Sequence, residues 1–280
     1  MKVSQTHSPA ATAERASRGS LLLTFFRLAS RVGWIGSLVY PAISVAIFLG
    51  LWEILITVFD VPLWLVPKPT DFIYRLQSDF PTIAAHAWTT SLTIFAGFLL
   101  GVAIAVPLGL IIVSVPALER GLYPVIVFLN IMPKTVIGPI LIIWFGVNPM
   151  VSVLIVFLMC FFPVLVDSMS GFRAMDPRLT YITRSMGATD WQTFRYVRLP
   201  ASMGYIVAGM KIGIVKAVEG VIIAEFIASN EGLGFMIMRA SSFMDMSLLF
   251  SGLVAVAIVA LIFNGLMSLA EWRLMPWRRR

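Results

Sequence analysis

The sequence predicts an all-α membrane protein with six transmembrane helices. Apolar residues make up 59% of the 280 positions, charged residues only 12%, and the mean hydropathy is +0.91. A soluble domain carries about 25% charged residues because its surface faces water. Since so little charge cannot cover a globule of this length, a lipid bilayer must solvate part of the chain.

Six stretches account for the predicted spans. A helix needs roughly 20 mostly apolar residues to cross the hydrocarbon core. The stretches that meet or nearly meet this length are residues 38–59, 86–113, 121–143, 150–166, 204–226 and 248–270. The longest remaining pieces, residues 1–37 and 167–203, are shorter than an ordinary domain. The predicted organisation is therefore an N-terminal tail (1–37), a six-span domain (38–271) and a basic C-terminus (272–280), with no enzyme attached.

Basic residues are distributed unevenly between alternate loops. The N-terminal tail, the connection that contains Arg120, loop 167–203 and the C-terminus together hold fifteen Lys and Arg residues. The opposite loops hold three: Lys68, Arg75 and Arg239. Cytoplasmic loops carry the excess of basic residues. The asymmetry predicts a multi-pass membrane protein with both termini and loop 167–203 in the cytoplasm. Membrane lipid, rather than nucleic acid, is then the partner that the net charge of +7 indicates.

The sequence lacks the residue patterns that nucleotide-binding and metal-binding sites require. A P-loop needs a glycine directly before its lysine, but none of the five lysines follows a glycine. The single cysteine, Cys160, and the two distant histidines, His7 and His86, give no metal-ligand spacing. We therefore expect no metal, no cofactor bound by this chain and no enzymatic activity of its own.

Loop 167–203 is the most informative segment. After Pro177 the residues suit a short helix that breaks near Gly187, and Thr189 or Asp190 is placed to cap a second helix. Trp191, Phe194 and Val197 would share one face of that helix. By pattern alone, an amphipathic helix lying on the bilayer surface fits this segment equally well.

The spacing from Gly187 to Pro200 resembles the cytoplasmic EAA loop of ABC importer permeases. That pattern runs Glu-Ala-Ala, three residues, Gly, nine residues, Ile, any residue, Leu-Pro, and this chain has Gly187, Val197 and Leu199-Pro200 at the matching positions. Other segments are similar to the nitrate/sulfonate/taurine branch of these permeases. They are Leu65-Val66-Pro67-Lys68-Pro69-Thr70, Met132-Pro133-Lys134, Trp144-Phe145-Gly146, Phe161-Phe162-Pro163, Ala224-Glu225-Phe226 and Gly232-Leu233-Gly234. The chain departs from the pattern at Tyr181-Ile182-Thr183, which occupies the Glu-Ala-Ala positions and lacks the loop glutamate.

The resemblance implies a type I (MetI-like) permease fold with its core domain at about residues 86–271. It also implies a location in the bacterial cytoplasmic (inner) membrane, a homodimer, two separate ATPase subunits that bind ATP-Mg, and a periplasmic or lipid-anchored solute-binding protein. The residues it assigns to the ATPase-coupling loop are Gly187, Ala188, Trp191, Phe194, Arg195, Val197, Arg198, Leu199 and Pro200.

Charged residues inside predicted spans are costly and mark candidate transport pathways. The fifth span contains Lys211, Lys216, Glu219 and Glu225. Lys216 lies twelve residues beyond Gly204, about 18 Å along a helix and near the bilayer midplane. The polar stripe of Lys216, Glu219 and Glu225 either faces the conduit or, for the Lys216–Glu219 pair, joins helices as a self-neutralised ion pair.

Lys134 lies between Pro133 and Pro139 in the third span, where prolines free backbone carbonyls and kink the helix. Broken helices often border transport pathways, so we assign Lys134 to the translocation path. A packing kink with Lys134 reaching toward an interface is the alternative.

The segment 227–247 is too polar to span a membrane and too apolar to be fully solvated. It is expected to form a short interfacial helix, with Gly232, Leu233 and Gly234 at the external gate and docking surface. His86 is expected to be an interfacial polar residue only.

Together these features predict the permease subunit of an ATP-driven importer for a small oxyanion such as nitrate, a sulfonate or taurine. Pyrimidine-type vitamin precursors and bicarbonate are alternative substrates. An ion-coupled secondary transporter or channel that uses Glu53, Lys216 and Glu219 is the competing interpretation.

Overall fold

The computed structural model describes residues 33–276, and these residues form helices and connecting turns with no strand. Most of the predicted N-terminal tail and the last four residues lie outside the described part. The chain divides into two units, Met1–Val61 and Pro62–Arg280. Helix α2 (Gly33–Val58) belongs to the first unit and covers the first predicted span.

The second unit contains the other five predicted spans, and α3 (Pro69–Ser78) precedes them. Their helices are α4 (Phe80–Ser114), the pair α5 (Pro116–Ile131) and α6 (Ile137–Phe145), α7 (Pro149–Arg173), α10 (Leu199–Ala228) and α12 (Met246–Leu274). The helices extend several residues beyond the apolar stretches. Since α7 continues to Arg173 and α10 begins at Leu199, the connection between them is shorter than the predicted loop 167–203.

Within the described residues, four helices are long and apolar enough to cross a membrane: α2, α4, α7 and α12. Helix α10 is equally long, but it contains Lys211, Lys216, Glu219 and Glu225. The third predicted span is broken, because α5 and the stretch Lys134–Phe145 meet at 78°. Met132, which precedes Pro133, is extended (φ −57°, ψ 134°), as expected for a residue whose helical conformation is disfavoured by the proline ring.

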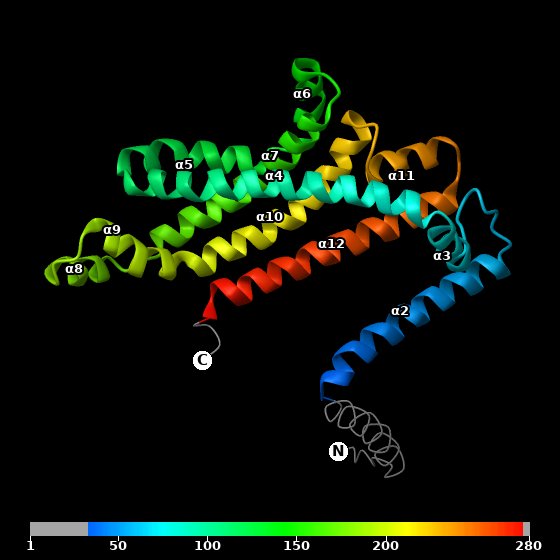
Figure 1. The fold of residues 1–280 in the computed structure, drawn as a ribbon, viewed down its shortest axis with the longest axis horizontal. Helices are drawn as coiled ribbons and strands as arrows, with labels where there is room; N and C mark the ends of the chain where they lie inside the picture. The colour runs from blue at the N-terminus through cyan, green and yellow to red at the C-terminus, as the bar shows by residue number, and fades with distance from the viewer. Residues whose placement is uncertain (1–32, 277–280) are drawn as a thin grey trace, which may run out of the picture. The chain divides into compact units, whose positions relative to one another are not determined.

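Helix α7 is the centre of the second unit and packs along both α4 and α10 (Figure 1). The backbones approach closely where glycines face the neighbouring helix. A Cβ atom on Gly101 of α4 would lie 2.5 Å from Cys160 Sγ of α7, and one on Gly213 of α10 would lie 2.9 Å from Val164 Cγ2. Small residues at contacts are typical of membrane helices, where packing rather than the hydrophobic effect drives association.

Side-chain pairs establish which helix ends lie together in this unit. At one end, Arg173 at the end of α7 pairs with Glu119 at the start of α5, and Lys211 of α10 pairs with Glu271 near the end of α12. This end also carries α8 (Pro177–Ser185) and α9 (Asp190–Thr193) (Figure 1). The opposite end holds α3, the start of α4 and α11 (Leu233–Ser242). The existence of α11 confirms the predicted short helix in segment 227–247.

Candidate translocation cavity and coupling segment

A cavity of about 440 Å³ lies between the break in the third span, α7 and α10. We call it the central cavity. Its charged lining residues are Lys134, Asp167 and Lys216, and Asn130 and Thr135 add polar groups. Met159, Pro163 and Ile212 provide apolar walls. The volume is in the range of small-molecule binding pockets.

Lys134 and Lys216 come from different elements. Lys134 begins the 3₁₀ turn η1 (Lys134–Val136), where its ammonium group donates a hydrogen bond to the Asn130 carbonyl and lies 5.3 Å from the Phe162 ring centroid. Lys216 forms the predicted ion pair with Glu219, three residues later, at 2.7 Å. Glu219 is not among the residues that line the central cavity.

Lys211 is placed differently from Lys216. Its ammonium group forms an ion pair with Glu271 of α12, near the end of the unit that carries α8 and α9. The third lysine inside the predicted spans therefore links two helices and does not line the central cavity.

Glu225 is separate from the central cavity and belongs to a buried network. Its side chain is 1% exposed, and its carboxylate accepts hydrogen bonds from the Thr90 hydroxyl (2.8 and 3.0 Å) and the Gly234 N–H (2.8 Å). The Thr90 hydroxyl in turn accepts a hydrogen bond from the Leu233 N–H at 2.8 Å. Buried polar groups of this kind are costly unless satisfied, and here the partners join α10, α4 and α11.

The predicted external segment Gly232-Leu233-Gly234 is held by this network. Gly232 has φ 103°, a conformation that only glycine adopts without strain, and a Cβ there would lie 2.2 Å from the Glu225 carboxylate. The Gly232 N–H donates to His86 Nδ1 at 3.1 Å. His86 therefore accepts a hydrogen bond from the turn before α11. This corrects the expectation that it is only an interfacial polar residue.

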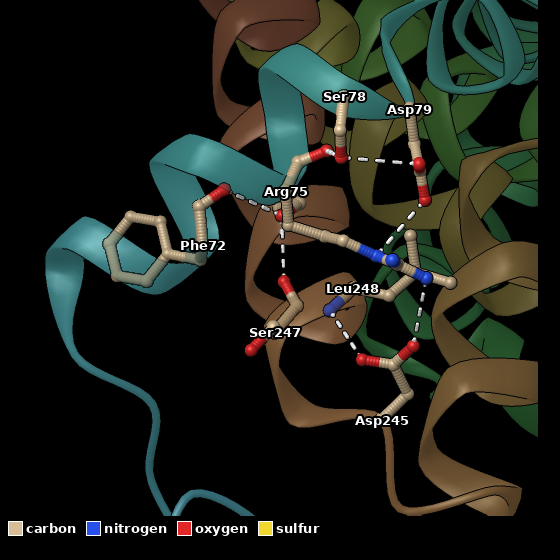
Figure 2. Close-up of polar contacts among 8 residues, drawn as sticks. Phe72, Arg75, Ser78, Asp79, Asp245, Ser247 and Leu248 are labelled. Atoms are coloured by element: carbon tan, nitrogen blue, oxygen red, sulfur yellow. Dashed lines mark hydrogen bonds and ion pairs between the residues drawn. The ribbon is translucent and has the colours of Figure 1, made fainter.

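A second set of contacts joins α3 to the start of α12. Figure 2 shows the Arg75 side chain extending from α3 toward Asp245, with ion pairs of 3.0 Å to Asp79 and 3.2 Å to Asp245. Asp245 also caps α12 by accepting a hydrogen bond from the Leu248 N–H at 3.0 Å. In addition, the Ser251 hydroxyl donates to the Phe72 carbonyl at 2.8 Å. No local sequence pattern indicates that these acidic and basic side chains meet, because Arg75 and Asp245 are 170 positions apart.

The segment from Asp176 to Pro200, called the coupling segment below, has the predicted two-helix form. Gly187 ends α8 with φ 78°, and the N–H of Ala188 donates to the Thr183 carbonyl at 3.0 Å. Thr189 caps α9 through a reciprocal pair of hydrogen bonds with Gln192, the arrangement known as a capping box. The predicted second helix differs in one respect, because α9 continues through a π turn (Phe194–Arg198) directly into α10.

The predicted apolar face of the coupling segment is only partly exposed. Trp191 is 66% exposed, whereas Phe194 and Val197 are half-buried, and the Trp191 and Phe194 rings lie 5.6 Å apart. Arg195 is exposed, and Arg198, Leu199 and Pro200 are half-buried where α10 begins. Other exposed large side chains in the same segment are those of Leu179, Tyr181, Ile182, Met186 and Tyr196.

Three residues near these sites were missed by sequence reasoning: Thr90, Asp167 and Arg75. Thr90 was visible as a polar residue within an apolar span, and Asp167 as the first acidic residue after one. Only their tertiary neighbours distinguish them from ordinary polar residues near helix ends.

Comparison with known proteins agrees with this architecture. Residues 97–276 match the family model of the binding-protein-dependent transport system inner membrane component. The chain is 25% identical to the taurine transport system permease of Escherichia coli, over 84% of this chain and 88% of that protein. It is also 25% identical to the formylaminopyrimidine transport permease of Halalkalibacterium halodurans, over 86% and 96% of the respective chains.

Among solved structures, an inward-facing form of the MetNI methionine ABC transporter contains a chain with the same fold. The TM-score is 0.57 at 17% identity, and the match covers 70% of this chain and 96% of the other. The MetI-like fold expected from the sequence is therefore confirmed. The match of 180 residues to the family model, together with these relatives, shows that the chain belongs to the family of binding-protein-dependent transport system inner membrane components, the multi-pass permease subunits of ABC importers.

Proposed function

We propose that this permease is driven by ATP hydrolysis on two separate subunits, which bind at the coupling segment, and that two copies of the chain form the conduit. The permease itself binds no nucleotide, and ATP-Mg is held by the partner subunits. A solute-binding protein delivers the substrate to the end of the unit that carries α3 and α11.

The exposed apolar surface of the coupling segment supports this proposal most directly. Trp191, Tyr196, Met186 and Tyr181 are each more than 60% exposed. A concentration of large apolar side chains on a short connection at the end of a helical bundle is typical of an interaction surface. Aromatic residues also dominate the energies of such interfaces.

Tyr181 and Ile182 stand where the family pattern has Glu-Ala, and both are exposed. These two side chains support a partner ATPase whose groove is more apolar than the groove of an ATPase that receives the loop glutamate of the family pattern. The Arg184–Asp190 ion pair of 3.3 Å joins α8 to α9 beside this surface. The partner would therefore bind α8 and α9 as one unit.

The basic residues support the orientation in which the coupling segment is cytoplasmic. Arg178, Arg184, Arg195 and Arg198 all lie in this segment, and the positive-inside rule places such residues on the cytoplasmic side. The coupling segment would then be accessible to ATPase subunits. The opposite end of the unit would face the periplasm.

The substrate we propose is a small anion of the oxyanion class, such as a sulfonate. The two lysines of the central cavity support an anion, and one relative is named as a taurine permease. The relative named as a formylaminopyrimidine permease keeps the pyrimidine-type alternative open for testing.

The test is purification of the full-length tagged chain from its native membranes, followed by assay of ATP hydrolysis in the purified complex. Trp191→Ala and Phe194→Ala are expected to remove the co-purifying ATPase activity, because truncating a buried aromatic anchor costs roughly 2 kcal/mol or more of binding energy. Arg195→Ala is the matched control at the rim and should retain most of the activity. Ion-driven uptake by vesicles that contain this chain alone would contradict the proposal and favour a secondary transporter.

A further inference from the structure

The central cavity combines two opposite charges, Lys134 and Asp167, that form no ion pair among the described residues. Lys134 donates to a backbone carbonyl, and no carboxylate pairs with it within residues 33–276. Asp167 lines the same cavity and takes part in no ion pair of the described residues. Both side chains are half-buried, and holding unpaired charges away from water is costly unless something else compensates them.

Asp167 and Lys216 border different parts of the central cavity. The Asp167 side chain lies against Gly209 of α10, where a Cβ atom would be 2.7 Å from Asp167 Cβ. Lys216 is seven residues beyond Gly209, which is two helical turns along the same face and about 10 Å of rise. Ile212 lies between them on that face and also lines the cavity.

The walls between the charged ends are apolar. Pro163 and Met159 of α7 face the cavity about one and two turns before Asp167, respectively, and Ile212 faces it from α10. This lining suits a short alkyl chain rather than a fully hydrated ion. The Lys134 ammonium lies at the break of the third span, on the element that closes the cavity beside α7.

We propose that the central cavity binds a small zwitterion, with Lys134 and Lys216 holding its anionic group and Asp167 holding its ammonium group across a short alkyl chain. A ligand of this type neutralises both unpaired protein charges at once, whereas a simple anion leaves Asp167 uncompensated. The inference rests on the proposed function as an anion importer and narrows its substrate class to amino-substituted anions.

The experiment measures binding to the purified full-length chain in lipid nanodiscs by calorimetric titration. The probes are taurine, which carries both charges, and ethanesulfonate, which lacks the ammonium group. Taurine is expected to bind more tightly than ethanesulfonate, by about tenfold or more, since only taurine offers Asp167 an ammonium group for a charge-assisted hydrogen bond. Asp167→Asn should reduce taurine binding to the level of ethanesulfonate and leave ethanesulfonate binding unchanged.

Lys134→Met should lower the binding affinity for both probes by about tenfold or more. Lys134→Arg should retain binding of both. Lys211→Met is the matched control, because Lys211 pairs with Glu271 outside the cavity. Size-exclusion profiles and tryptophan emission verify that each variant is folded. Equal binding of the two probes by the unaltered chain, absence of binding by either, or an equal loss in Lys211→Met would overturn the proposal.

The outcome is separable from that of the proposed function. If vesicles that contain the reconstituted complex still take up taurine with ATP when the chain carries Lys134→Met or Asp167→Asn, the proposed zwitterion site is wrong. The ATP-driven mechanism would still stand. If the coupling-segment variants leave ATPase activity unchanged while taurine binds as expected, the ATPase-docking proposal fails and the cavity assignment stands.

Discussion

The hydroxyl of Thr90 and the carboxylate of Glu225, 135 positions apart in the sequence, are joined by a 2.8 Å hydrogen bond in the interior of the protein. This pair also receives the backbone N–H groups of Leu233 and Gly234. It therefore fixes the start of α11 against α4 and α10. The turn before α11 owes its position to side chains and not to its own apolar contacts alone.

Thr90→Val is expected to destabilise the protein by about 1.5–3 kcal/mol, because it leaves a buried carboxylate and the Leu233 N–H without the hydroxyl partner. Thr90→Ser should have a stability close to that of the unaltered chain, because serine keeps the hydroxyl. The measurement is the thermal unfolding midpoint in detergent micelles. Thr93→Val is the control, since among the described residues the Thr93 hydroxyl bonds to the Thr89 carbonyl of its own helix. An equal effect of both valine variants would contradict the role of Thr90.

Gly234→Ala is expected to destabilise the α10–α11 junction by roughly 1–3 kcal/mol through overpacking. Its Cβ would lie 2.8 Å from both Glu225 Cβ and the Ile222 carbonyl oxygen. Gly204→Ala is a matched control in α10, where the added Cβ meets nothing within 4 Å. It should stabilise the helix by up to about 1 kcal/mol, as measured by unfolding in the same micelles.

Asp245→Ala should destabilise more than Asp245→Asn. Alanine removes the α12 cap, which contributes about 1 kcal/mol, as well as the ion pair with Arg75. Asparagine keeps a capping oxygen and loses only the ion pair, a partly exposed contact that contributes at most about 1 kcal/mol. Thermal unfolding midpoints of both variants at low and high salt separate the two contributions, because only the ion-pair contribution should decrease with salt. Equal midpoints for Asp245→Ala and Asp245→Asn would show that the cap contributes nothing.

Cysteine labelling tests the proposed orientation. In a Cys160→Ala background, Ser185→Cys in the coupling segment should react with a membrane-impermeant maleimide only after the cells are permeabilised. Tyr74→Cys on α3 is exposed and should react in intact cells. Labelling in the reverse order would place the coupling segment outside the cytoplasm and exclude docking of a cytoplasmic ATPase there.

Length and periodicity along the chain determined the helical spans, because crossing a bilayer requires about 20 consecutive apolar residues whatever their neighbours are. Local chemistry likewise predicted the break near Pro133, the left-handed turn at Gly187 and a cap at Thr189 or Asp190, of which the structure shows Thr189. Each depends on residues within about one helical turn. The Lys216–Glu219 pair was predictable for the same reason, since residues three apart share a helix face.

Only the tertiary structure decided which polar residues meet. Glu225 and Lys216 belong to the same charged helix, but one side chain bonds to Thr90 and the other lines a cavity with Lys134 and Asp167. His86 and Arg75 gained their partners in the same way, from α11 and α12. A sequence shows that a buried charge must be compensated. The compensating group, however, comes from whichever helix packs against that charge. Helix packing depends on close approach over the whole contact surface rather than on any local pattern.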